Sequence, residues 1–503
     1  MLTGRLDMFL VSVGFNNPST LVVGQKFNQH SRKRLANSMQ QPGGKRLNMN
    51  RILTWMLLCG GIMNGYLAMA ESKEAPARFR LITLDPGHFT AALVQKFMYP
   101  DVDSLVYVYA PGTNDLDEHL KRIERFNTRA EQPTHWREKV YTGPDFLEKM
   151  LSEKAGNIVV IAGNNTNKTE YILRSVQAGL NVLADKPMAI TPDDFVRLQQ
   201  AFAVAASNHV LLYDIMTERY EITTALQREL SQQPGLFGEL VKGSSNEPAI
   251  TKESVHHFSK IVAGTPLKRP AWYFDVRQQG EGIVDVTTHL VDLIQWEVFP
   301  EQALSPADAT VLSARRWATP ITREQFKHVT GVDNFPDFLK SDVKDGVLQV
   351  YANGEFTYRL RDVYAKVSVT WNYEAPPGAG DMHYSLMRGT KANLVIRQGA
   401  DQKFKPVLYV EKVGNVDDAA FETALKAAIQ NLQGKYPGVG FRRDGKTWQV
   451  TVPEKYDVGH EAHFAQVTDN YLRYLRAGRM PDWEVPNMIT KYATIMKAYE
   501  LSR

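Results

Sequence analysis

The sequence contains a single cysteine, Cys59, among its 503 residues. One thiol cannot form an intrachain disulfide or a site built from several thiolates, so a disulfide framework and a cysteine-based metal centre are excluded. Strong charge of one sign is also absent, because the net charge is +4 and the longest basic cluster is only Arg32–Arg34. Nucleic acid is therefore not an expected partner.

Long hydrophobic runs are scarce as well, and the most apolar segment is ILTWMLLCGGIMNGYLAMA, residues 52–70. Arg51 precedes it and the small residues 68–70 end it, which is the layout of a secretory signal peptide. Asn64 interrupts the run and leaves it short for a membrane span. We predict a signal peptide over residues 49–70, a periplasmic or secreted protein, and no stable membrane span after cleavage.

Residues 1–48 precede the predicted signal peptide, and the chain that follows it is long enough for more than one folded domain. Residues 1–48 are polar and lack periodicity, which predicts a disordered leader or a start codon assigned too early, with Met49 preferred as the true start. The overall composition, 43% hydrophobic and 23% charged, is ordinary for a globular protein. The remaining length exceeds what one hydrophobic core usually serves, so we expect two domains.

Short apolar runs alternate with helical patterns over residues 78–220. LITL (81–84), LVYVYA (105–110) and NIVVIAG (157–163) are typical of buried strands, and amphipathic stretches separate them. Such alternation implies parallel strands joined by helical crossovers. The predicted fold class is therefore α/β, with a Rossmann-type doubly wound parallel sheet in a dinucleotide-binding domain.

The pattern changes from residue 236 onward, where strands follow one another with few helices between them. GELVKGSSN (238–246) predicts a strand, and Asn353–Gly354 predicts a type I′ hairpin turn. Residues 416–455 contain a helical pattern and a second hairpin signal, which indicates an insertion. We predict that residues 236–503 form an α+β domain with a large, mainly antiparallel open sheet.

Glycine is scarce where a dinucleotide fold needs it most, in the segment DPGHFT that follows the first predicted strand. Gly87 could permit the close approach of a phosphate, with His88 and Phe89 beside it. Asp85 would repel a phosphate, and Pro86 has no amide hydrogen to donate. This turn alone does not predict a bound dinucleotide.

The next strand ends also lack part of the usual binding pattern. No acid follows the second strand at Tyr109, where a carboxylate normally binds the ribose, although Asp115 could substitute from the loop. Asn164 and Asn165 follow the third apolar run. Their side chains could bind a cofactor ribose or a sugar, or they could cap the next helix.

Lys186 is the most informative residue of the first half, because it stands between the buried-strand pattern ending at Asp185 and Pro187. In an open parallel sheet, residues at the carboxyl end of a strand face the ligand cleft. We therefore expect Lys186 in the cleft, and the alternative is a lysine that leaves the sheet toward solvent.

Asp285, His289 and Asp292 have the spacing of one helical face. A carboxylate one turn from an imidazole can fix its tautomer and raise its basicity, which suits a general base. A histidine satisfied within the core is an equally good interpretation of the triplet alone. No metal site is predicted, although His256, His257 and His289 could converge.

Together these motifs resemble the Gfo/Idh/MocA family, the relatives of glucose–fructose oxidoreductase and inositol dehydrogenase. Lys186–Pro187 matches the family's Glu-Lys-Pro, QQGEGIVDVTTH (278–289) matches its Gly-Gly-Gly-x-x-x-Asp-x-x-x-His, and MRGTKANLVI (387–396) matches its later Gly-Thr strand. Each motif is short, but the three occur in the family's order. The resemblance extends from Phe79 to the C-terminus.

The resemblance implies a cofactor, NAD or NADP, in the first domain, and oligomer contacts through the open sheet, hence a homo-oligomer. The residues expected near the cofactor are Gly87, His88, Phe89, Asn164, Asn165, Asp185, Lys186 and Pro187. Lys186 would contact substrate and nicotinamide, and His289 would act as the acid–base group. Asp285 would be its partner or a contact to a substrate hydroxyl.

The resemblance implies a small carbohydrate or polyol as the substrate, and polar and aromatic side chains precede the predicted His289 helix. Such residues suit sugar stacking and hydrogen bonding, although Trp272 and Tyr273 could equally form a packed interface. The expected substrate contacts are Arg219, His257, Trp272, Tyr273, Arg277 and Asp292.

Three functions remain open at this point. The first is an exported oxidoreductase of carbohydrates or polyols. Because free dinucleotide is scarce outside the cytoplasm, the second is a redox-neutral glycosidase or lyase with a resident NAD. The third is a carbohydrate-binding protein that has lost the cofactor.

Overall fold

The protein is described here from a computed structural model, which covers residues 78–262 and 265–503. The leader and signal peptide predicted for residues 1–48 and 49–70 lie outside the described residues. Among the described helices, none is both long enough and apolar enough to cross a membrane.

The first sheet has six parallel strands in the order β3-β2-β1-β4-β5-β6, which is the order of dinucleotide-binding domains. The apolar sequences of β1 and β4 are wholly buried, as expected for a sheet with helices on both faces. The strands are β1 (Leu81–Leu84), β2 (Leu105–Ala110), β3 (Arg137–Thr142), β4 (Ile158–Ile161), β5 (Asn181–Asp185) and β6 (Leu212–Ile215).

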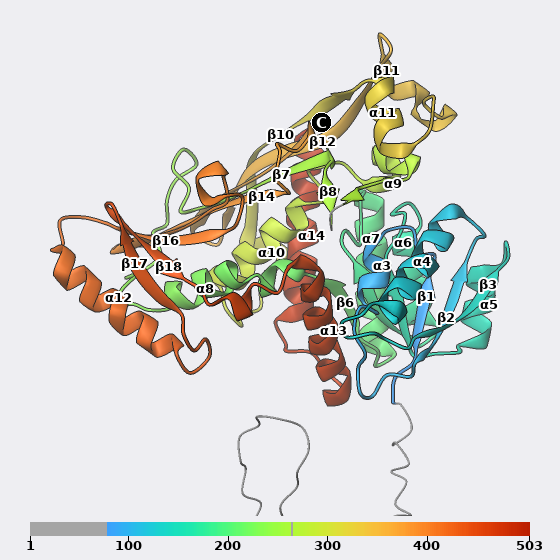
Figure 1. Cartoon of the computed structure of the whole chain (residues 1–503), viewed down its shortest axis with the longest axis horizontal. Coiled ribbons are helices and arrows are strands. Elements are labelled where there is room, and N and C mark those ends of the chain that lie inside the picture. The colour runs from blue at the N-terminus through green and yellow to red at the C-terminus, as the bar shows by residue number, and fades with distance from the viewer. Residues whose placement is uncertain (1–77, 263–264) are drawn as a thin grey trace, which may run out of the picture. The chain divides into compact units, whose positions relative to one another are not determined.

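The helices of this domain surround the sheet at the blue and teal end of the chain (Figure 1). One differs from the sequence expectation, because the helical pattern after the first strand forms only a single turn. The helices are α3 (Thr90–Leu93), α4 (Asn114–Thr128), α5 (Phe146–Glu153), α6 (Lys168–Gln177) and α7 (Pro192–Ser207). After β6 come the 3-10 helix η1 (Thr217–Tyr220) and α8 (Ile222–Ser231), and α8 packs against the second sheet.

The second sheet has ten strands, and every pairing is antiparallel except that of β13 with β7. The open, largely antiparallel sheet predicted from the sequence is confirmed. Its strands are β7 (Ile250–Ser259), β10 (Ala309–Ile321), β11 (Val343–Lys344), β12 (Val347–Leu360), β13 (Val363–Glu374), β14 (Met382–Arg388), β15 (Ala392–Arg397), β16 (Val407–Lys412), β17 (Gly440–Asp444) and β18 (Thr447–Thr451).

Shorter elements link and flank this sheet. They are β8 (Ile261–Val262), β9 (Thr265–Pro266), η2 (Ala271–Phe274), α9 (Val276–Gln279), α10 (Thr287–Val298), η3 (Pro306–Asp308), α11 (Arg323–Thr330), η4 (Asp337–Asp342), η5 (Ala400–Gln402), α12 (Asp418–Leu432), η6 (Glu454–Tyr456), α13 (His460–Ala477) and α14 (Glu484–Leu501).

The strand predicted over residues 238–246 is wrong. This segment forms only isolated bridges, from Leu240 and Gly243, and the strand of this region is β7, which starts at Ile250. β7 carries the sequence SVHHF, which sequence reasoning treated only as a source of polar side chains. Placing those residues in a strand decides which of them can face the same side.

The hairpin predicted at Asn353–Gly354 is also wrong, because both residues lie inside the continuous strand β12. The Asn353 side chain donates to the Trp317 carbonyl and accepts from the Trp371 amide, bridging a register shift between β10 and β12. A Cβ atom at Gly354 would lie 2.5 Å from the Cβ of Ile283. The pair therefore serves a bulge and a close packing contact instead of a turn.

Residues 416–455 contain α12 and the β17–β18 hairpin, which lie together at one end of the large sheet (Figure 1). The hairpin turns after Asp444, which pairs with Thr447, as the sequence predicted. β18 also pairs with β16, so this segment extends the sheet instead of standing apart from it.

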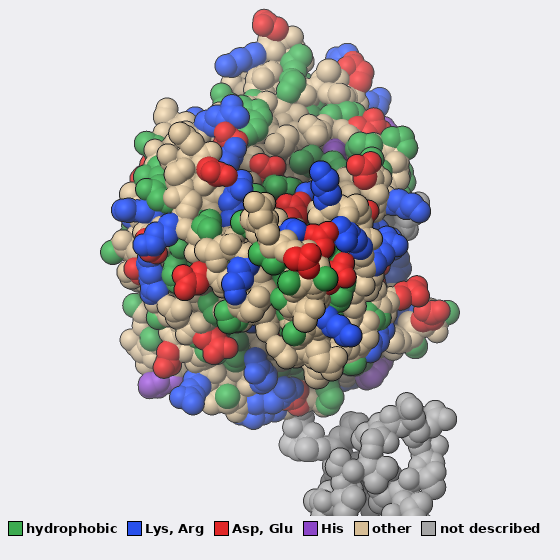
Figure 2. Space-filling model, turned by 90° about the vertical axis from the view of Figure 1, so that its left-hand side faces the viewer, with side chains coloured by type: hydrophobic (Ala, Val, Ile, Leu, Met, Phe, Trp, Pro, Cys, Tyr) green, Lys and Arg blue, Asp and Glu red, His purple; other side chains and the backbone are tan. Residues whose placement is uncertain are grey.

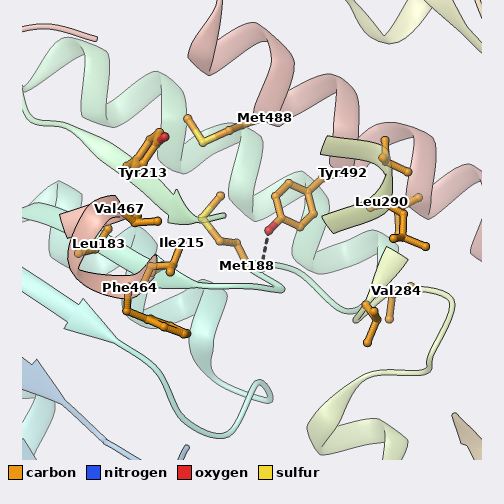
Figure 3. Close-up of a cluster of buried hydrophobic side chains, with 14 of the residues drawn as sticks. Leu183, Met188, Tyr213, Ile215, Val284, Leu290, Phe464, Val467, Met488 and Tyr492 are labelled. Carbon is orange, nitrogen blue, oxygen red and sulfur yellow. Dashed lines mark hydrogen bonds between the residues drawn. The ribbon is translucent and has the colours of Figure 1, made fainter. Parts of the chain in front are cut away.

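Helices α10, α13 and α14 lie between the two sheets and join them into one hydrophobic core. The Met188 amide donates to the Tyr492 hydroxyl at 3.0 Å, which fixes the chain after β5 to α14 (Figure 3). Apolar side chains from five elements pack around this bond: Leu183, Ile215, Leu290, Phe464, Val467 and Met488.

On the face shown in Figure 2, basic and acidic side chains are interspersed, and neither kind forms a continuous patch. This distribution agrees with the small net charge of +4. It gives no electrostatic surface of the type that tracks a nucleic-acid backbone.

Candidate functional site

A cavity of about 480 Å³ opens where the carboxyl ends of β4, β5 and β6 meet the second domain. Ligands bind at this edge of open parallel sheets because the strand ends and following loops leave a crevice there. The first domain contributes Asn165, Asp185 and Lys186 to the wall, and the second contributes His256 and His289. The structure therefore brings the principal predicted residues of both domains to one site.

Lys186 and Asp285 form an ion pair across the domain junction. The Lys186 Nζ donates to the Asp285 Oδ1 at 2.6 Å, and Gln279 donates to the other oxygen at 3.1 Å. Burial opposes the charge on the lysine, but the carboxylates of Asp285 and Asp185 outweigh it and raise the pKa of Lys186. The pair is ionised and presents an ammonium group to the cavity.

A second set of polar contacts supports the carboxyl end of β5. Thr90 donates to the Asp185 Oδ2 at 2.6 Å, and the Thr90 hydroxyl is 2.7 Å from the His88 Nδ1. Lys168 turns back from the start of α6 to donate to the Asp185 carbonyl, and burial lowers the pKa of its amine to about 8. Sequence reasoning missed Lys168 and Thr90, because each looked like an ordinary residue at a helix start.

His289 lines the cavity, as predicted, but its environment differs from the expectation. α10 begins at Thr287, so Asp285 lies in the turn before the helix and binds Lys186 instead of the imidazole. The His289 Nδ1 is buried and has no hydrogen-bond partner among the described residues. Burial, followed by the charge of Lys186, lowers the pKa of His289 to about 3. Glu218 and Asp185 act against this shift without outweighing it, and the prediction that Asp285 raises the basicity of His289 is wrong.

Arg219 and Asp292 were expected to contact substrate, and the structure places them elsewhere. Arg219 binds both oxygens of Asp292, at 2.6 and 2.7 Å, and also contacts Glu484. Lys491 donates to Asp292 at 3.0 Å and to Asp214 at 2.6 Å. Neither Arg219 nor Asp292 lines the cavity. Their charges are used in this buried ion cluster, and the prediction of a substrate contact is wrong for both.

The two neighbouring histidines of β7 face opposite sides, because alternate residues of a strand do. His256 lines the cavity, whereas His257 is 1% exposed and is not part of the wall. His256, and not His257, therefore lies where a substrate contact was expected. Recognising β7 as a strand would have found this alternation in the sequence.

Of the remaining predicted substrate contacts, one lines the cavity and two do not. Tyr273 lines the cavity, as expected. Trp272 lies outside it, and its indole Nε1 donates to the Asp115 carboxylate at 2.9 Å. Arg277 is half exposed and binds the Phe338 carbonyl and Asp342 at the domain surface. Trp272 therefore connects the two domains and Arg277 fixes a loop of the second domain, and neither lines the cavity.

The turn that follows β1, residues 85–89 (the β1 turn), does not fit the pyrophosphate of a dinucleotide in its usual position. The amides of Gly87 and His88, which would bind the phosphates, both donate to the Ala162 carbonyl at 3.2 Å. Asp85 occupies the place of the first glycine, with a φ of 47°. Its carboxylate accepts from Tyr171, and burial raises the pKa of that carboxyl.

Asp115 brings a second carboxylate to the same turn. A Cβ atom on Gly87 would lie 3.5 Å from the Asp115 Oδ2, and Trp272 ties that oxygen to the second domain. The Asn164 side chain donates to Gln278 at 2.7 Å and is likewise engaged by the second domain. Gly87, Asn164 and Pro187 do not line the cavity, so these predicted cofactor contacts are not brought to it.

The cavity itself fits the nicotinamide end of such a cofactor better than the turn fits the pyrophosphate. Asn165 lines it with a side-chain Oδ1 that is buried and has no partner among the described residues. His88, Phe89, Asp185 and Lys186 border the same space. An amide or ribose hydroxyl could donate to the free oxygen of Asn165.

Metal chemistry has no visible framework in the described part of the chain. No group of three or more histidine, cysteine, aspartate and glutamate side chains is arranged there to hold an ion.

Comparisons with known proteins agree with this architecture. Residues 226–503 match the family profile described as "Putative oxidoreductase C terminal domain". Residues 112–213 match the profile "Oxidoreductase family, NAD-binding Rossmann fold", so the match starts after the β1 turn. A search of curated proteins found no match.

Solved structures extend the comparison. An oxidoreductase structure from Parabacteroides merdae is 58% identical, with a TM-score of 0.83, and the match covers 85% of this chain and 98% of that one. An oxidoreductase structure from Thermotoga maritima is 14% identical over 84% and 97% of the two chains, with a TM-score of 0.53. A 3-ketoreductase from Actinomadura kijaniata, solved with TDP-benzene and NADP, is also 14% identical, over 85% and 98%, with a TM-score of 0.50.

The last two structures, at 14% identity, show the fold alone. The profile over the second domain covers more than half of the chain, and the Parabacteroides protein matches along nearly its whole length. The chain therefore belongs to the Gfo/Idh/MocA family of oxidoreductases, with a first domain of the NAD-binding Rossmann type.

Proposed function

We propose that the cavity binds a carbohydrate or polyol and that the protein oxidises or reduces it at a carbinol carbon with a nicotinamide cofactor. The observation that carries this proposal is a pair of buried acceptors without partners among the described residues. Asn165 Oδ1 and Asp381 Oδ1 both belong to residues of the cavity wall. A ligand rich in hydroxyl groups donates to such atoms and removes the cost of leaving them unpaired.

Aromatic side chains support the same ligand class. Tyr273 and Trp371 line the cavity, with ring centroids 5.9 Å apart, and Tyr384 and Tyr456 add further aromatic surface. Arg269 lies 4.3 Å from the centre of the Tyr273 ring and fixes it from behind. Rings next to charged acceptors match the alternating apolar and hydroxylated faces of a sugar.

Two residues would contact the reacting hydroxyl of the substrate. The Lys186 ammonium would stabilise the oxygen of the reacting hydroxyl as its proton leaves, because Asp285 holds the amine in its charged form. His289, with a pKa of about 3, is unprotonated at neutral pH and would accept a hydrogen bond from that hydroxyl and orient it. A nicotinamide, when bound beside these residues, supplies the hydride acceptor.

The test combines nucleotide identification with turnover. Nucleotide extracted from the purified protein is identified by mass spectrometry, and NAD⁺ and NADP⁺ reduction is followed with a panel of sugars and polyols. We expect bound or binding nucleotide and turnover that His289→Ala abolishes, with Lys121→Ala on the exposed face of α4 as the matched control.

The other outcomes separate the remaining functions. Substrate conversion with a resident nucleotide but no net reduced nicotinamide would replace net oxidation by redox-neutral cleavage. A protein that binds sugars and has no affinity for either nucleotide in calorimetry would contradict both enzymatic functions and favour a binding protein.

We also propose that residues 49–70 direct export and are then removed. The basic, apolar and small-residue segments of this stretch support the proposal. Mass spectrometry of the mature N-terminus, after separation of periplasm from cytoplasm, tests it. An intact N-terminus in the cytoplasmic fraction would contradict it.

A further inference from the structure

A chain of hydrogen bonds runs along the second-domain wall of the cavity, outside the Lys186–His289 group. The His256 Nδ1 lies 3.0 Å from the Asp381 Oδ2, and the His256 Nε2 lies 2.6 Å from the Ser254 Oγ. The same Ser254 oxygen lies 3.1 Å from the His383 Nδ1. Neighbouring strands β7 and β14 position three of these residues, and Asp381 directly precedes β14.

Burial lowers the pKa of His256, and with this ring neutral the donors and acceptors of the chain have one self-consistent assignment. Burial opposes ionisation of Asp381, but His256 and the Lys260 ammonium outweigh it and hold the carboxyl pKa well below its usual value. An ionised carboxylate only accepts, so the His256 Nδ1 carries a hydrogen and its Nε2 accepts from the Ser254 hydroxyl. Ser254 in turn accepts from the His383 Nδ1–H.

This assignment leaves the His383 Nε2 as an unprotonated nitrogen on a residue that lines the cavity. The other end of the chain is well suited to a positive charge. His256 stacks on Trp371 with ring centroids 4.9 Å apart, and Asp381 also binds Lys260. Burial lowers the pKa of His256, and the Asp381 carboxylate and the Trp371 face act against this shift, so they would partly stabilise an imidazolium formed there. The His289 Nδ1, by contrast, has no hydrogen-bond partner among the described residues.

We propose that His383 is the acid–base group that takes the proton of the reacting hydroxyl and that Ser254, His256 and Asp381 form a relay for this proton. The proposal rests on the proposed function, because it needs a substrate hydroxyl in the cavity. The substrate O–H bond breaks and its proton goes to the His383 Nε2. The Nδ1 proton of His383 passes to Ser254, and the Ser254 proton passes to the His256 Nε2.

The step balances without a redox partner. The substrate becomes an alkoxide, Ser254 remains a hydroxyl, and His383 returns to the neutral state with its hydrogen on the other nitrogen. His256 becomes an imidazolium paired with the Asp381 carboxylate. The hydride that leaves the same substrate carbon belongs to the oxidoreductase reaction and does not pass through the relay.

The arrangement of serine, histidine and aspartate resembles that of a hydrolase, but the serine is not placed as a nucleophile. Ser254 is 1% exposed and does not line the cavity. Its oxygen is held between two imidazoles. A proton can cross such a position, whereas a substrate carbonyl cannot reach it.

Nitrogen-15 NMR of the full chain, labelled at histidine, tests the assignment without any substrate. We expect His256 and His383 to be neutral, with hydrogen on Nδ1, and we expect Ser254→Ala to change the signals of both rings. His256→Gln and His383→Gln assign the signals. A hydrogen on the Nε2 of either ring in the wild-type protein would overturn the relay, whatever the enzyme turns over.

Kinetics supply the second test. Ser254→Ala should lower kcat by about 10²- to 10⁴-fold, the range of a lost acid–base step, and leave KM unchanged. Ser254→Thr should restore part of kcat, and the solvent deuterium isotope effect should fall in Ser254→Ala because fewer protons move together. Ser313→Ala, at an exposed serine of strand β10, is the control, and melting temperatures identify misfolded variants.

Asp381→Asn provides an independent variant if Ser254→Ala does not fold, and it should lower kcat in the same way. An active wild-type enzyme whose kcat and isotope effect are unchanged in both variants would overturn the relay and leave the proposed function intact. A wild-type protein without oxidoreductase activity would overturn the proposed function, and the NMR result would then decide the relay alone.

Discussion

Two ion clusters stand close to one another in this protein and use the same kinds of residue for different purposes. Lys186 and Asp285 form one, at the cavity, where the lysine side chain is 20% exposed. Lys491, Asp214 and Asp292 form the core of the other, where the lysine side chain is fully buried. Asp285 and Asp292 are only seven positions apart in the sequence. The same kinds of charged residue therefore occur both at the cavity and in the interior.

The difference lies in how each cluster satisfies its charges. Lys491 contacts two carboxylates and has no access to solvent, and Arg219 contacts Asp292 and Glu484, so each charged group of the cluster has an oppositely charged partner inside it. Lys186 has one direct carboxylate contact and a free side toward the cavity. The comparison teaches that a charged residue left incomplete at a cavity is a better functional candidate than one whose partners are all present.

The largest effect is expected from Lys491→Met. Removing one partner of a buried ion pair leaves unpaired carboxylates in the interior, which costs about 3–5 kcal/mol. The free energy of unfolding, measured with urea, should fall by this amount. Lys497→Met, on the exposed side of the same helix α14, should change it by less than about 0.5 kcal/mol. Equal stability of the two variants would remove the distinction between the clusters.

Lys186→Ala should lower activity strongly and stability only a little, the reverse of what we expect for Lys491→Met. We expect kcat/KM to fall by about 10²- to 10⁴-fold, because the reacting oxygen loses its cationic partner. The unfolding free energy should fall by less than in Lys491→Met, because water in the cavity can solvate Asp285. Steady-state kinetics and urea unfolding of the same preparation measure both values. A variant that loses stability and retains activity would place Lys186 in the structural group.

Acidification should lower the free energy of unfolding through the buried histidines that line the cavity. Burial, the largest cause in each case, lowers the pKa of His88 and His463 to about 4 and that of His289 to about 3. The unfolded chain binds these protons near pH 6.5, so it holds more protons than the folded chain below that pH. The contribution of these histidines to the free energy of unfolding is therefore fully present above about pH 6.5 and is lost as the pH falls toward 4.

Each of these histidines contributes up to about 1.4 kcal/mol per pH unit to that slope. Urea unfolding between about pH 7 and pH 5 measures it. His463→Leu should reduce the slope, whereas Lys497→Met, on the exposed side of α14, should change neither the stability nor the slope. A flat profile for the wild-type protein would show that the imidazoles are not buried in their neutral form.

The smallest effect is expected at the β1 turn, where Asp115→Asn removes a carboxylate beside Gly87 and keeps an acceptor for Trp272. Repulsion of a pyrophosphate should decrease by about 1 kcal/mol or more, so affinity for NAD or NADP should rise about fivefold to tenfold. Calorimetry measures the change, with Asp117→Asn on the exposed face of α4 as the control. Unchanged affinity would mean that Asp115 does not oppose the phosphates.

Much of the first domain could be predicted from the sequence, because buried parallel strands are continuous apolar runs. β1 and β4 have that form, whereas β3 is an edge strand with no fully buried residue and gave no such signal. Asn353–Gly354 has the composition of a turn, but packing against Ile283 and the bulge beside Trp317 determine its role. Local composition cannot report such long-range contacts.

The candidate site could be predicted only in part for a similar reason. Lys186 was found because a lysine at the end of a buried strand needs an explanation. The assignment of Asp285 to His289 failed because it depended on where α10 begins, and a single turn decided it. His256 and His383 meet only because β7 and β14 pair, which no spacing in the sequence reveals.

The most direct test of the cavity as an oxidoreductase site is the transfer of label from substrate to cofactor. A polyol deuterated at its carbinol carbons is incubated with the protein and NAD⁺ or NADP⁺, and the nicotinamide is analysed by mass spectrometry. The proposed function predicts deuterium on the nicotinamide with wild-type protein and none with Lys186→Ala. A consumed polyol with unlabelled nicotinamide, or equal labelling by Lys186→Ala, would contradict it.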